Sequence, residues 1–240
     1  MEKVVLLTKV AIDLFSGTGS ATKAFQRSDK WQVFRVEKDP EKAAEYDAEL
    51  QADVLELEPE DLPQPDFVWA SPPCTDFSVA GIAKTWTKQN LPRRQSVADS
   101  VQLVYHTLWL IQELNPDFWF LENPRGMLRR IMPRKPTGQV TYCQYGMDYM
   151  KPTDLWGRHP ASMEYHTCSP GDQCHISNSR EANTFGDTTR ATAVHGDNAA
   201  ERARVPYKLS KAILKAVESP DRKIQQASLA DVREKNGDDE

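Results

Sequence analysis

The feature that most constrains the fold of this chain is the alternation of short apolar runs with helix-like segments. The apolar runs are rich in β-branched and aromatic residues and cover 4–15, 31–37, 67–70 and 117–123. Helical periodicity lies between them, at 20–28, 40–50 and 96–114, and Ser96 or Asp99 is a candidate cap of the longest helix. This alternation predicts an α/β fold with a doubly wound, mostly parallel sheet, in which ligands bind beyond the carboxyl ends of the strands.

The alternation weakens after Pro133. Residues 139–146 still predict a strand, and residues 206–218 predict a closing helix. Residues 157–200 are rich in Gly, Ser, Thr, Asn and His without a clear period, which indicates an insert built from loops. The charged stretch 220–240 has few apolar residues and predicts a flexible tail.

Length and cysteine content limit the class of protein. A chain of 240 residues is long enough for one domain with a buried core. Its apolar runs are too short for a signal peptide or a membrane span, so we expect a soluble, cytoplasmic protein. Four cysteines without a secretory signal predict free thiols or metal ligands rather than disulfides.

Charge is distributed unevenly along the chain. The net charge is −5, but residues 1–77 carry 16 acidic and 8 basic side chains, whereas residues 78–160 carry 6 acidic and 11 basic ones. The basic middle therefore permits contact with a polyanion despite the overall negative charge.

A glycine-containing turn, "AIDLFSGTGSA", follows the first predicted strand. Gly17 and Gly19 would let a ligand approach the backbone, although Thr22 stands where a dinucleotide fingerprint has its third glycine. Asp13 lies at the end of the strand, where a carboxylate repels a pyrophosphate and attracts a cationic sulfonium group. The turn therefore favours S-adenosylmethionine over a nicotinamide dinucleotide.

Two further carboxylates follow at successive strand ends. Glu37 ends the second predicted strand, where a carboxylate can accept hydrogen bonds from both ribose hydroxyls. Asp53 lies where a third strand would end, in a place to accept from an adenine amino group. Three carboxylates at consecutive strand ends are more typical of a nucleoside site than of solvated loop charges.

The segment "SPPCTDFS" places Cys74 directly after two prolines at the end of the fourth predicted strand. The prolines stiffen the backbone that presents the thiol. Methylation of carbon 5 of cytosine requires such a thiolate to add to carbon 6, and an acid to neutralise N3. Glu122 in "FLENP", at the end of the fifth predicted strand, is the candidate acid.

Taken together, these motifs resemble those of the cytosine-5 DNA methyltransferases. Motifs one, two, three, four and six are matched in order and spacing by "DLFSGTGS", "VEKD", "ADV", "SPPCTDFS" and "LENP". Looser matches to the eighth and tenth motifs are "QYGMDYMKPTDLW" and "RARVPYKLSKAIL". The resemblance implies a Rossmann-like, S-adenosylmethionine-dependent class I methyltransferase fold.

The resemblance also implies a division of the chain and a set of site residues. Residues 1–156 would form the catalytic domain, 157–200 a reduced target-recognition insert similar to that of small, phage-encoded members, and 201–219 a helix that returns to the catalytic domain. The implied catalytic residues are Cys74, Glu122 and Asn123. The implied cofactor contacts are Asp13, Phe15, Ser16, Gly17, Thr18, Gly19, Glu37, Asp53, Val54, Pro72 and Val205.

The sequence departs from the family pattern at two motifs. Thr75 stands where a glutamine usually follows the Pro-Cys pair. The Gln-x-Arg-x-Arg motif appears as "QVTYC", residues 139–143, without either arginine. Lys151 or Arg125 is the candidate replacement near the carbonyl of the cytosine.

A base inside a duplex cannot reach Cys74, so the target cytosine would have to be flipped out. Residues 78–94 follow the nucleophile and predict a mobile loop that closes on the nucleic acid. The candidate nucleic-acid contacts are Lys84, Lys88, Arg93, Arg94, Arg125 and Lys151.

A group of potential metal ligands lies in the reduced insert. The stretch "HTCSPGDQCH" offers His166, Cys168, Cys174 and His175, with Cys143 as a further candidate, and suggests a structural zinc site. The spacing differs from that of standard zinc fingers, and we expect difficulty in bringing the adjacent Cys174 and His175 to one tetrahedral ion.

Several alternatives remain open at the level of the sequence. The same chemistry could act on an unpaired cytosine in RNA, such as a transfer RNA. A degenerate methyltransferase could bind nucleic acid without turnover, and a nicotinamide-dependent enzyme could use a catalytic thiol. For the leading reading we expect double-stranded DNA and a restriction endonuclease as partners, a monomeric state, and a prokaryotic or viral gene.

Overall fold

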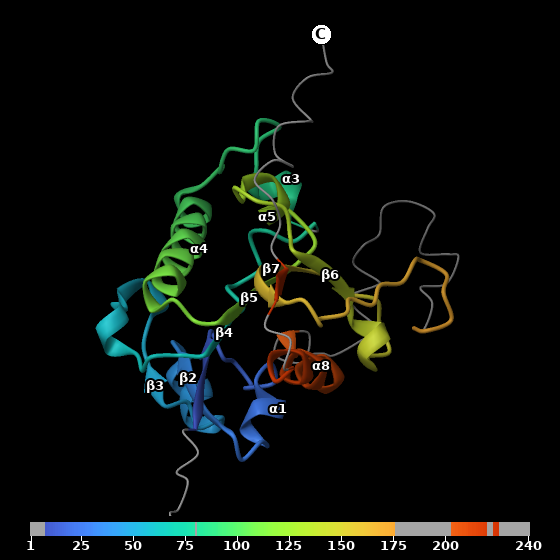
Figure 1. The fold of residues 1–240 in the computed structure, drawn as a ribbon. Helices are drawn as coiled ribbons and strands as arrows, with labels where there is room; N and C mark the ends of the chain where they lie inside the picture. The colour runs from blue at the N-terminus through green and yellow to red at the C-terminus, as the bar shows by residue number, and fades with distance from the viewer. Residues whose placement is uncertain (1–7, 80, 176–202, 220–222, 226–240) are drawn as a thin grey trace, which may run out of the picture.

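The sheet at the centre of the molecule has the predicted α/β architecture. The computed structural model describes residues 8–79, 81–175, 203–219 and 223–225. Within these residues, the strands follow the order β3-β2-β1-β4-β5-β7-β6, and β8 pairs with β7 (Figure 1). The first five strands run parallel, whereas β7 runs antiparallel to both β5 and β6. The prediction of a doubly wound, mostly parallel sheet is confirmed.

The bounds of the elements are as follows. The strands are β1 (Lys9–Leu14), β2 (Trp31–Glu37), β3 (Leu50–Gln51), β4 (Phe67–Ala70), β5 (Phe118–Pro124), β6 (Gly138–Thr141), β7 (Pro152–Pro160) and β8 (Ile224–Gln225). The α-helices are α1 (Lys23–Gln26), α2 (Pro40–Glu45), α3 (Ile82–Thr85), α4 (Gln95–Leu114), α5 (Leu128–Ile131) and α8 (Tyr207–Val217). The 3-10 helices are η1 (Val54–Glu56), η2 (Pro59–Asp61) and η3 (Tyr142–Tyr145).

Both faces of the sheet are covered by hydrophobic cores. In β4, Phe67 and Trp69 pack into a core shared with α1 and α8, whereas Val68 and Ala70 pack into a second core shared with α4. Figure 1 shows α8 and α4 on opposite sides of the sheet. Burial on both faces explains why the central strands are continuous apolar runs without polar alternation.

The predicted helices form, but with different bounds. The helices expected at 20–28 and 40–50 shorten to α1 and α2. The long helix α4 begins at Gln95, and its N-cap residue Arg94 makes no side-chain cap. The predicted caps are therefore wrong: Ser96 lies in the first turn, where its carbonyl accepts a hydrogen bond from the Ser100 hydroxyl.

The region around the eighth motif differs most from expectation. The strand predicted at 139–146 ends at Thr141 and turns into η3, because the chain must reverse to enter β7. Strand β7 was not predicted, and it crosses the domain boundary expected at 156/157. It is buried along most of its length, so it shows no polar alternation. Its Gly157 lies so close to β5 that a Cβ there would be 2.0 Å from the Trp119 carbonyl oxygen.

The C-terminal segment returns to the sheet, as predicted. Helix α8 packs on α1 and contributes Leu209 and Ile213 to the core. Residues 223–225, expected in the flexible tail, instead pair with the end of β7. Residues 176–200 of the insert and 226–240 of the tail lie outside the described residues.

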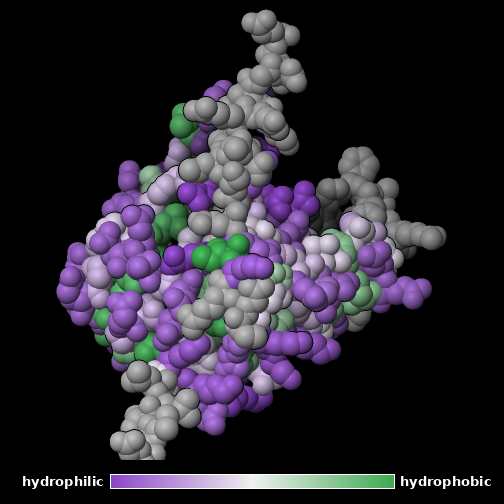
Figure 2. All heavy atoms as spheres, in the orientation of Figure 1, coloured by the Kyte–Doolittle hydropathy of each residue, from purple (hydrophilic) through white to green (hydrophobic). Residues whose placement is uncertain are grey.

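The polarity of the surface and the length of the helices bear on whether the molecule could meet a membrane. Figure 2 shows a mostly hydrophilic face on which the hydrophobic residues form separate patches. Among the described residues, no helix has the length and apolar character needed to cross a membrane.

Candidate active site

The glycine turn after β1 has the backbone conformation that a ligand cradle needs. Phe15, Gly17 and Gly19 all have positive φ angles, of 64°, 50° and 64°. The positive angle at Phe15 is unusual for a bulky residue and marks stored strain. A Cβ at Gly17 would meet only the Phe15 carbonyl oxygen at 4.0 Å, whereas one at Gly19 would lie 2.9 Å from Nη1 of Arg35. Gly17 thus faces open space, and Gly19 makes room for an arginine.

Glu37 is tied to the glycine turn, as the sequence suggested. One oxygen of its carboxylate accepts a hydrogen bond from the Gly17 amide at 2.8 Å, and the other accepts from the Asp39 amide at 3.0 Å. The carboxylate is therefore fixed beside the turn at the end of β2.

Asp53 lies after β3, at the next strand end. Its carboxylate accepts from the Leu55 amide at 3.1 Å and from the ammonium group of Lys38. Partial burial opposes ionisation, but these donors outweigh it and lower the pKa of Asp53. Val54, which follows, is buried. The carboxylate is thus held ionised at a strand end, and its contact with a ligand stays a prediction.

Asp13 is enclosed rather than open to solvent. Its carboxyl group is fully buried, one oxygen accepts from the Thr22 hydroxyl at 2.6 Å, and the other has no partner among the described residues. Burial raises the pKa of Asp13 to about 7. Thr22, at the place of the missing third glycine, thus serves to hold Asp13. The contact of Asp13 with a sulfonium stays a prediction.

The C-terminal segment closes on the same turn. The Val205 amide donates to the Ser20 hydroxyl at 3.0 Å, and the Ser210 hydroxyl of α8 accepts from the Ala24 amide at 3.0 Å. The structure therefore brings Val205 beside the turn that contains Ser16 and Thr18, although 185 positions separate Val205 from its Ser20 partner. This placement is what the match to the tenth motif predicted.

The loop of Cys74 is fastened to both neighbouring strand ends. On the side of β1, the Ser71 amide donates to the Leu14 carbonyl at 3.2 Å. On the side of β5, the Asn123 side-chain amide donates to the Pro72 carbonyl at 3.0 Å in a buried contact. Cys74 itself is partly buried, and it forms no disulfide among the described residues.

A second pairing joins the loop after Cys74 to the loop after Glu122. The Met127 amide donates to the Phe77 carbonyl at 2.7 Å, and Ser78 forms a bridge with Gly126. A Cβ at Gly126 would lie 2.1 Å from the Phe77 carbonyl oxygen, so only glycine fits. Because β4 and β5 are parallel neighbours, this pairing holds the nucleophile and acid candidates at one edge of the sheet.

The environment of Glu122 favours a protonated carboxyl group. The side chain is 5% exposed, and burial raises its pKa above the ordinary value, although nearby Lys151 and a hydrogen bond from Tyr142 oppose the shift. The Tyr142 hydroxyl donates to Glu122 Oε1 at 3.0 Å, and the Lys151 ammonium lies 4.6 Å from the centre of the Tyr142 ring. Glu122 can thus supply a proton at a pH where an exposed glutamate would be ionised.

Sequence reasoning missed two residues around Glu122. Tyr142 lies between the two positions where the family has arginines, and its hydroxyl reaches Glu122. Asp154 of β7 is fully buried and forms a two-pronged ion pair with Arg129 of α5. Only the antiparallel pairing of β7 with β5 brings Asp154 opposite Asn123, so the sequence held no local signal for it.

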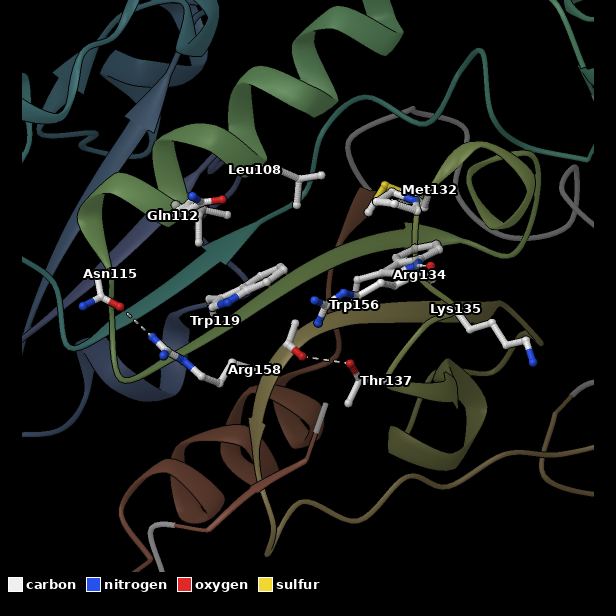
Figure 3. A pocket seen from close by; sticks show the side chains of 13 residues that line it. Leu108, Gln112, Asn115, Trp119, Met132, Arg134, Lys135, Thr137, Trp156 and Arg158 are labelled. Atoms are coloured by element: carbon white, nitrogen blue, oxygen red, sulfur yellow. Dashed lines mark hydrogen bonds between the residues drawn. The ribbon is translucent and has the colours of Figure 1, made fainter. Parts of the chain in front are cut away.

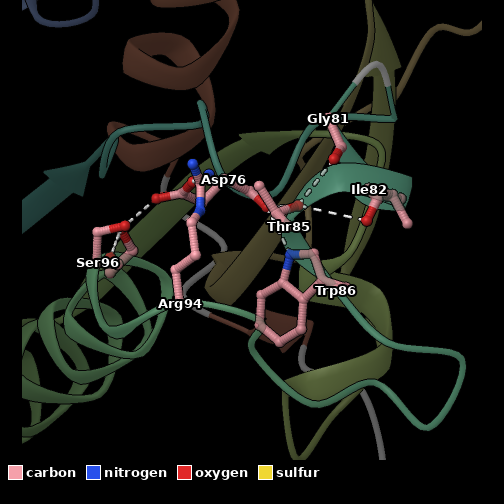
Figure 4. A network of polar contacts seen from close by, with 8 residues as sticks. Asp76, Gly81, Ile82, Thr85, Trp86, Arg94 and Ser96 are labelled. Carbon is pink, nitrogen blue, oxygen red and sulfur yellow. Dashed lines mark hydrogen bonds and ion pairs between the residues drawn. The ribbon is translucent and has the colours of Figure 1, made fainter.

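Residues 81–94 of the loop after Cys74 lead into α4, which contacts Asp76 through Ser100 (Figure 4), and the mobility expected of this loop stays a prediction. Trp86 is buried, and its indole nitrogen donates to the Asp76 carbonyl at 2.6 Å. The Asp76 carboxylate accepts from the Ser100 hydroxyl at 2.8 Å and lies 3.9 Å from the Arg94 guanidinium. Trp86 and Asp76 thus fix the base of the loop next to Cys74.

The basic candidates divide into two groups. Arg93 and Arg94 are exposed but also hold the loop, since Arg93 donates to the Trp86 carbonyl at 2.8 Å. Lys84 and Lys88 are exposed, and within the described residues neither forms an ion pair. Arg125 is exposed after β5, and Lys151 lies near Glu122. Lys84 and Lys88 are therefore the charges most available to a phosphate.

Three cysteines and one histidine meet at the edge of the sheet beyond η3. Ligand atoms of Cys143, Cys168, Cys174 and His175 all lie within 4.8 Å of one another. The difficulty expected in bringing the adjacent Cys174 and His175 together does not arise, because Cys174 Sγ lies 3.4 Å from His175 Nδ1. His166 was also misassigned, since its exposed ring lies outside the cluster, 3.8 Å from the Glu164 carboxylate, and Cys143 takes its place.

A separate pocket lies away from this edge. It has a volume of about 340 Å³ and lies between the C-terminal half of α4, the start of β5 and the end of β7 (Figure 3). Arg158 crosses its floor, donating to the side chain of Asn115 at 3.2 Å. The pocket lies toward the amino end of β5, whereas Cys74 and Glu122 lie at or beyond carboxyl ends, so it is not the candidate active site.

The fold and the site together define a Rossmann-like methyltransferase. The glycine turn, the strand-end carboxylates and the paired Cys74 and Glu122 loops all lie at the carboxyl edge of the parallel strands, where this architecture binds its ligands.

Comparison with known proteins identifies the family. A family model described as C-5 cytosine-specific DNA methylase matches residues 10–133. The chain is 31% identical over 161 residues to a probable DNA (cytosine-5)-methyltransferase of Frog virus 3 (isolate Goorha), covering 60% of this chain and 68% of that protein. The chain therefore belongs to the C-5 cytosine-specific DNA methylase family, whose members depend on S-adenosylmethionine.

More distant similarities cover smaller parts of the relatives. The type II methyltransferase M.FnuDI of Fusobacterium nucleatum is 28% identical over 124 residues, which is 50% of this chain and 33% of that enzyme. A solved methyltransferase structure, EhMeth of Entamoeba histolytica, aligns with a TM-score of 0.47 at 14% identity, over 68% of this chain and 57% of that one. The chain thus spans about a third of the bacterial relative.

Proposed function

We propose that this chain methylates carbon 5 of cytosine in double-stranded DNA, with Cys74 as nucleophile and Glu122 as acid. The observation that carries the proposal is the double fastening of the Cys74 loop to the Glu122 strand end, through Asn123 and through Gly126. It brings the two groups that the chemistry needs to one edge of the sheet. The membership in the family supports the same substrate.

The residues divide the work in the reaction. The thiolate of Cys74 adds to carbon 6 of a cytosine that has left the duplex, which makes carbon 5 nucleophilic. The buried carboxyl group of Glu122 donates to N3, where negative charge would otherwise develop. Once carbon 5 carries the methyl group, a base such as water takes the proton from carbon 5, the thiolate of Cys74 leaves carbon 6, and the N3 proton returns to Glu122, which restores the aromatic ring and the enzyme.

S-adenosylmethionine supplies the methyl group. The described residues fit it, because Gly17 leaves an open side at the turn and the carboxylates of Glu37 and Asp53 supply hydrogen-bond acceptors at the next two strand ends. Glu37 and Asp53 would hold the ribose and adenine groups. One buried oxygen of Asp13 has no partner among the described residues, so it is available to the cationic sulfonium group.

Lys151 is our candidate for the role of the missing arginines in the eighth motif. It lies over the Tyr142 ring and close enough to Glu122 to lower the pKa of that carboxyl group. A cation at this place would contact the carbonyl oxygen of a cytosine whose N3 faces Glu122. Arg125, whose amide donates to the Pro152 carbonyl, is the alternative.

Nucleoside analysis tests the proposed function directly. DNA and RNA from cells that express the wild-type chain or Cys74→Ala would be digested and examined for 5-methylcytosine by mass spectrometry. We expect 5-methylcytosine in DNA with the wild type alone. A rise only in RNA would move the activity to RNA, and no rise in either would favour a nucleic-acid-binding homologue without turnover.

The cellular setting belongs to the same proposal. It includes the restriction endonuclease partner, the monomeric state and the intracellular location that the sequence led us to expect. Bisulfite sequencing of the modified DNA would show the target sequence on which such an endonuclease would act.

A further inference from the structure

The Cys/His cluster brings together two parts of the chain that are far apart in sequence. Cys143 lies in η3, which directly follows β6. Cys168, Cys174 and His175 lie in the segment after β7. The Sγ atoms of Cys143 and Cys168 are 3.1 Å apart, and those of Cys143 and Cys174 are 3.6 Å apart. His175 Nδ1 lies 3.8 Å from Cys168 Sγ and 3.4 Å from Cys174 Sγ.

These separations are close to those of ligands around one tetrahedral ion. With zinc–sulfur bonds of about 2.3 Å and zinc–nitrogen bonds of about 2.0 Å, tetrahedral angles place sulfur atoms about 3.8 Å apart and sulfur and nitrogen about 3.5 Å apart. A disulfide does not describe the cluster, because it would need two sulfurs about 2.05 Å apart and would use only two of the three thiols. We propose that Cys143, Cys168, Cys174 and His175 bind one structural Zn²⁺ ion.

The local backbone holds the ligands in place. Ser169, Pro170, Gly171 and Asp172 form a turn between Cys168 and Cys174, with Pro at the second position and Gly171 at a φ of 96° at the third. The Asp172 amide donates to the Ser169 carbonyl at 3.2 Å, which closes a type II turn. The turn reverses the chain so that both thiols face the same point.

The donor set is that of a closed, structural site. Three thiolates and an imidazole complete a tetrahedron without a place for water or substrate, and soft sulfur ligands select zinc over magnesium or calcium. Cys143 and His175 are buried, at 6% and 8% exposure, so the ion would be shielded from solvent.

The two positions where the eighth motif lacks arginine both serve this site. Cys143 is a ligand, and the Thr141 hydroxyl accepts a hydrogen bond from the Cys168 amide at 3.2 Å. The Thr141 amide in turn donates to the His166 carbonyl at 2.9 Å. The departures from the motif therefore build an attachment for the insert instead of a contact with the base.

The ion would couple the insert to the candidate acid. Cys143 directly follows Tyr142, whose hydroxyl donates to Glu122. A metal bond at Cys143 restrains η3 and thereby the position of the Tyr142 ring. This consequence rests on the proposed function, whereas the presence of the zinc site does not.

Metal analysis of the full chain tests the site. The wild-type protein, purified under reducing conditions with zinc in the medium, should hold one zinc ion per chain by mass spectrometry, against close to none in Cys143→Ser and Cys174→Ser. His166→Ala, which changes the neighbouring histidine outside the cluster, is the matched control and should keep its zinc. Cobalt substitution should give the visible bands of a tetrahedral thiolate site in the wild type and in His166→Ala.

A ligand exchange guards against variants that fail to fold. Cys174→His should still bind one metal ion, with a cobalt spectrum shifted toward two sulfur and two nitrogen ligands. The proposal is overturned if folded wild-type protein neither contains nor takes up zinc, if a disulfide forms within the cluster under the same conditions, or if His166→Ala loses zinc as the cysteine variants do. These readouts do not depend on methyltransferase activity.

Discussion

Cys74 and Glu122 lie on different elements and require different tests. For Cys74, the test is Cys74→Ala, which removes the thiol that would add to carbon 6. Methyl transfer to DNA should fall below detection, whereas the affinity for S-adenosylmethionine, measured by calorimetry, should stay near that of the wild type. An equal loss of cofactor affinity would mean that Cys74 supports the structure instead.

Glu122 is expected to act through its proton. Glu122→Gln keeps the size of the side chain and removes the acid, so kcat should fall by roughly 10²–10⁴-fold with little change in DNA affinity. Single-turnover rates on one DNA substrate would measure the chemical step. An unchanged rate would remove Glu122 from the mechanism.

Tyr142 should set the pH range in which Glu122 is protonated. Its hydrogen bond lowers the pKa of Glu122 against the rise caused by burial, so Tyr142→Phe should raise that pKa further. Because activity requires the protonated acid, the basic limb of the profile of kcat against pH should move to higher pH. Tyr145→Phe is the matched control, since its hydroxyl donates to the Glu164 carbonyl. An equal shift in both variants would contradict this role.

Asp13 should make folding stability depend on pH. Its pKa is raised from the ordinary value of 3.8 to about 7 by burial. A carboxyl group with a raised pKa in the folded state contributes stability below its unfolded pKa, and this contribution is lost as pH rises through about 7. Thermal melts of the wild type should therefore fall relative to Asp13→Asn between pH 4 and pH 7, and parallel curves would contradict the burial of this charge.

At the scale of elements, the pairing between the loops after β4 and β5 holds Cys74 and Glu122 at the same edge of the sheet. Gly126→Ala would place a Cβ 2.1 Å from the Phe77 carbonyl oxygen and force the two loops apart. We expect a loss of stability of about 1–3 kcal/mol and a larger fall in kcat than in cofactor affinity. Gly81→Ala, where the nearest atom is 3.2 Å away, is the milder control. Equal effects of both substitutions would show that the pairing is not specific.

The elements also show how far the sequence could predict the structure. Strands β2 and β4 were predicted with the correct bounds, because their apolar runs are bounded by polar and turn residues. Strand β7 was missed because Pro152, Gly157 and Pro160 interrupt the pattern and burial removes the alternation. Residues 152–160 form a strand only because they pair with β5 and β6, and this pairing cannot be seen in the local sequence.

The candidate site could be predicted where a motif ends a parallel strand or where the chain matches the tenth motif. Glu37 and Val205 lie beside the glycine turn as expected. Tyr142 and Asp154 could not be found, because their approach to Glu122 depends on the antiparallel β7 and on the turn into η3. The sequence offered both His166 and Cys143 as ligands, and it could not decide between them because the approach of Cys143 depends on how the segment after β7 folds back on η3.

For the whole molecule, the uneven charge predicts how DNA binding depends on salt. Lys84→Gln with Lys88→Gln removes two exposed charges beside the Cys74 loop, so the slope of log K against log salt should decrease in magnitude by about 1.8. Lys9→Gln with Lys30→Gln, at the amino ends of β1 and β2, removes the same charge from the opposite edge of the sheet and should leave the slope unchanged. The reverse order of effects would place DNA on the other edge.

The central claim is that Cys74 forms a covalent bond with a cytosine of DNA. A duplex that contains the methylated site, with 5-fluorocytosine at the target position, would be incubated with S-adenosylmethionine and the wild-type chain or Cys74→Ser. Fluorine at carbon 5 cannot leave as a proton does, so the adduct persists. The account predicts a stable protein–DNA adduct that maps to the peptide of Cys74 in the wild type and is absent from Cys74→Ser; an adduct that survives in Cys74→Ser or maps elsewhere would contradict it.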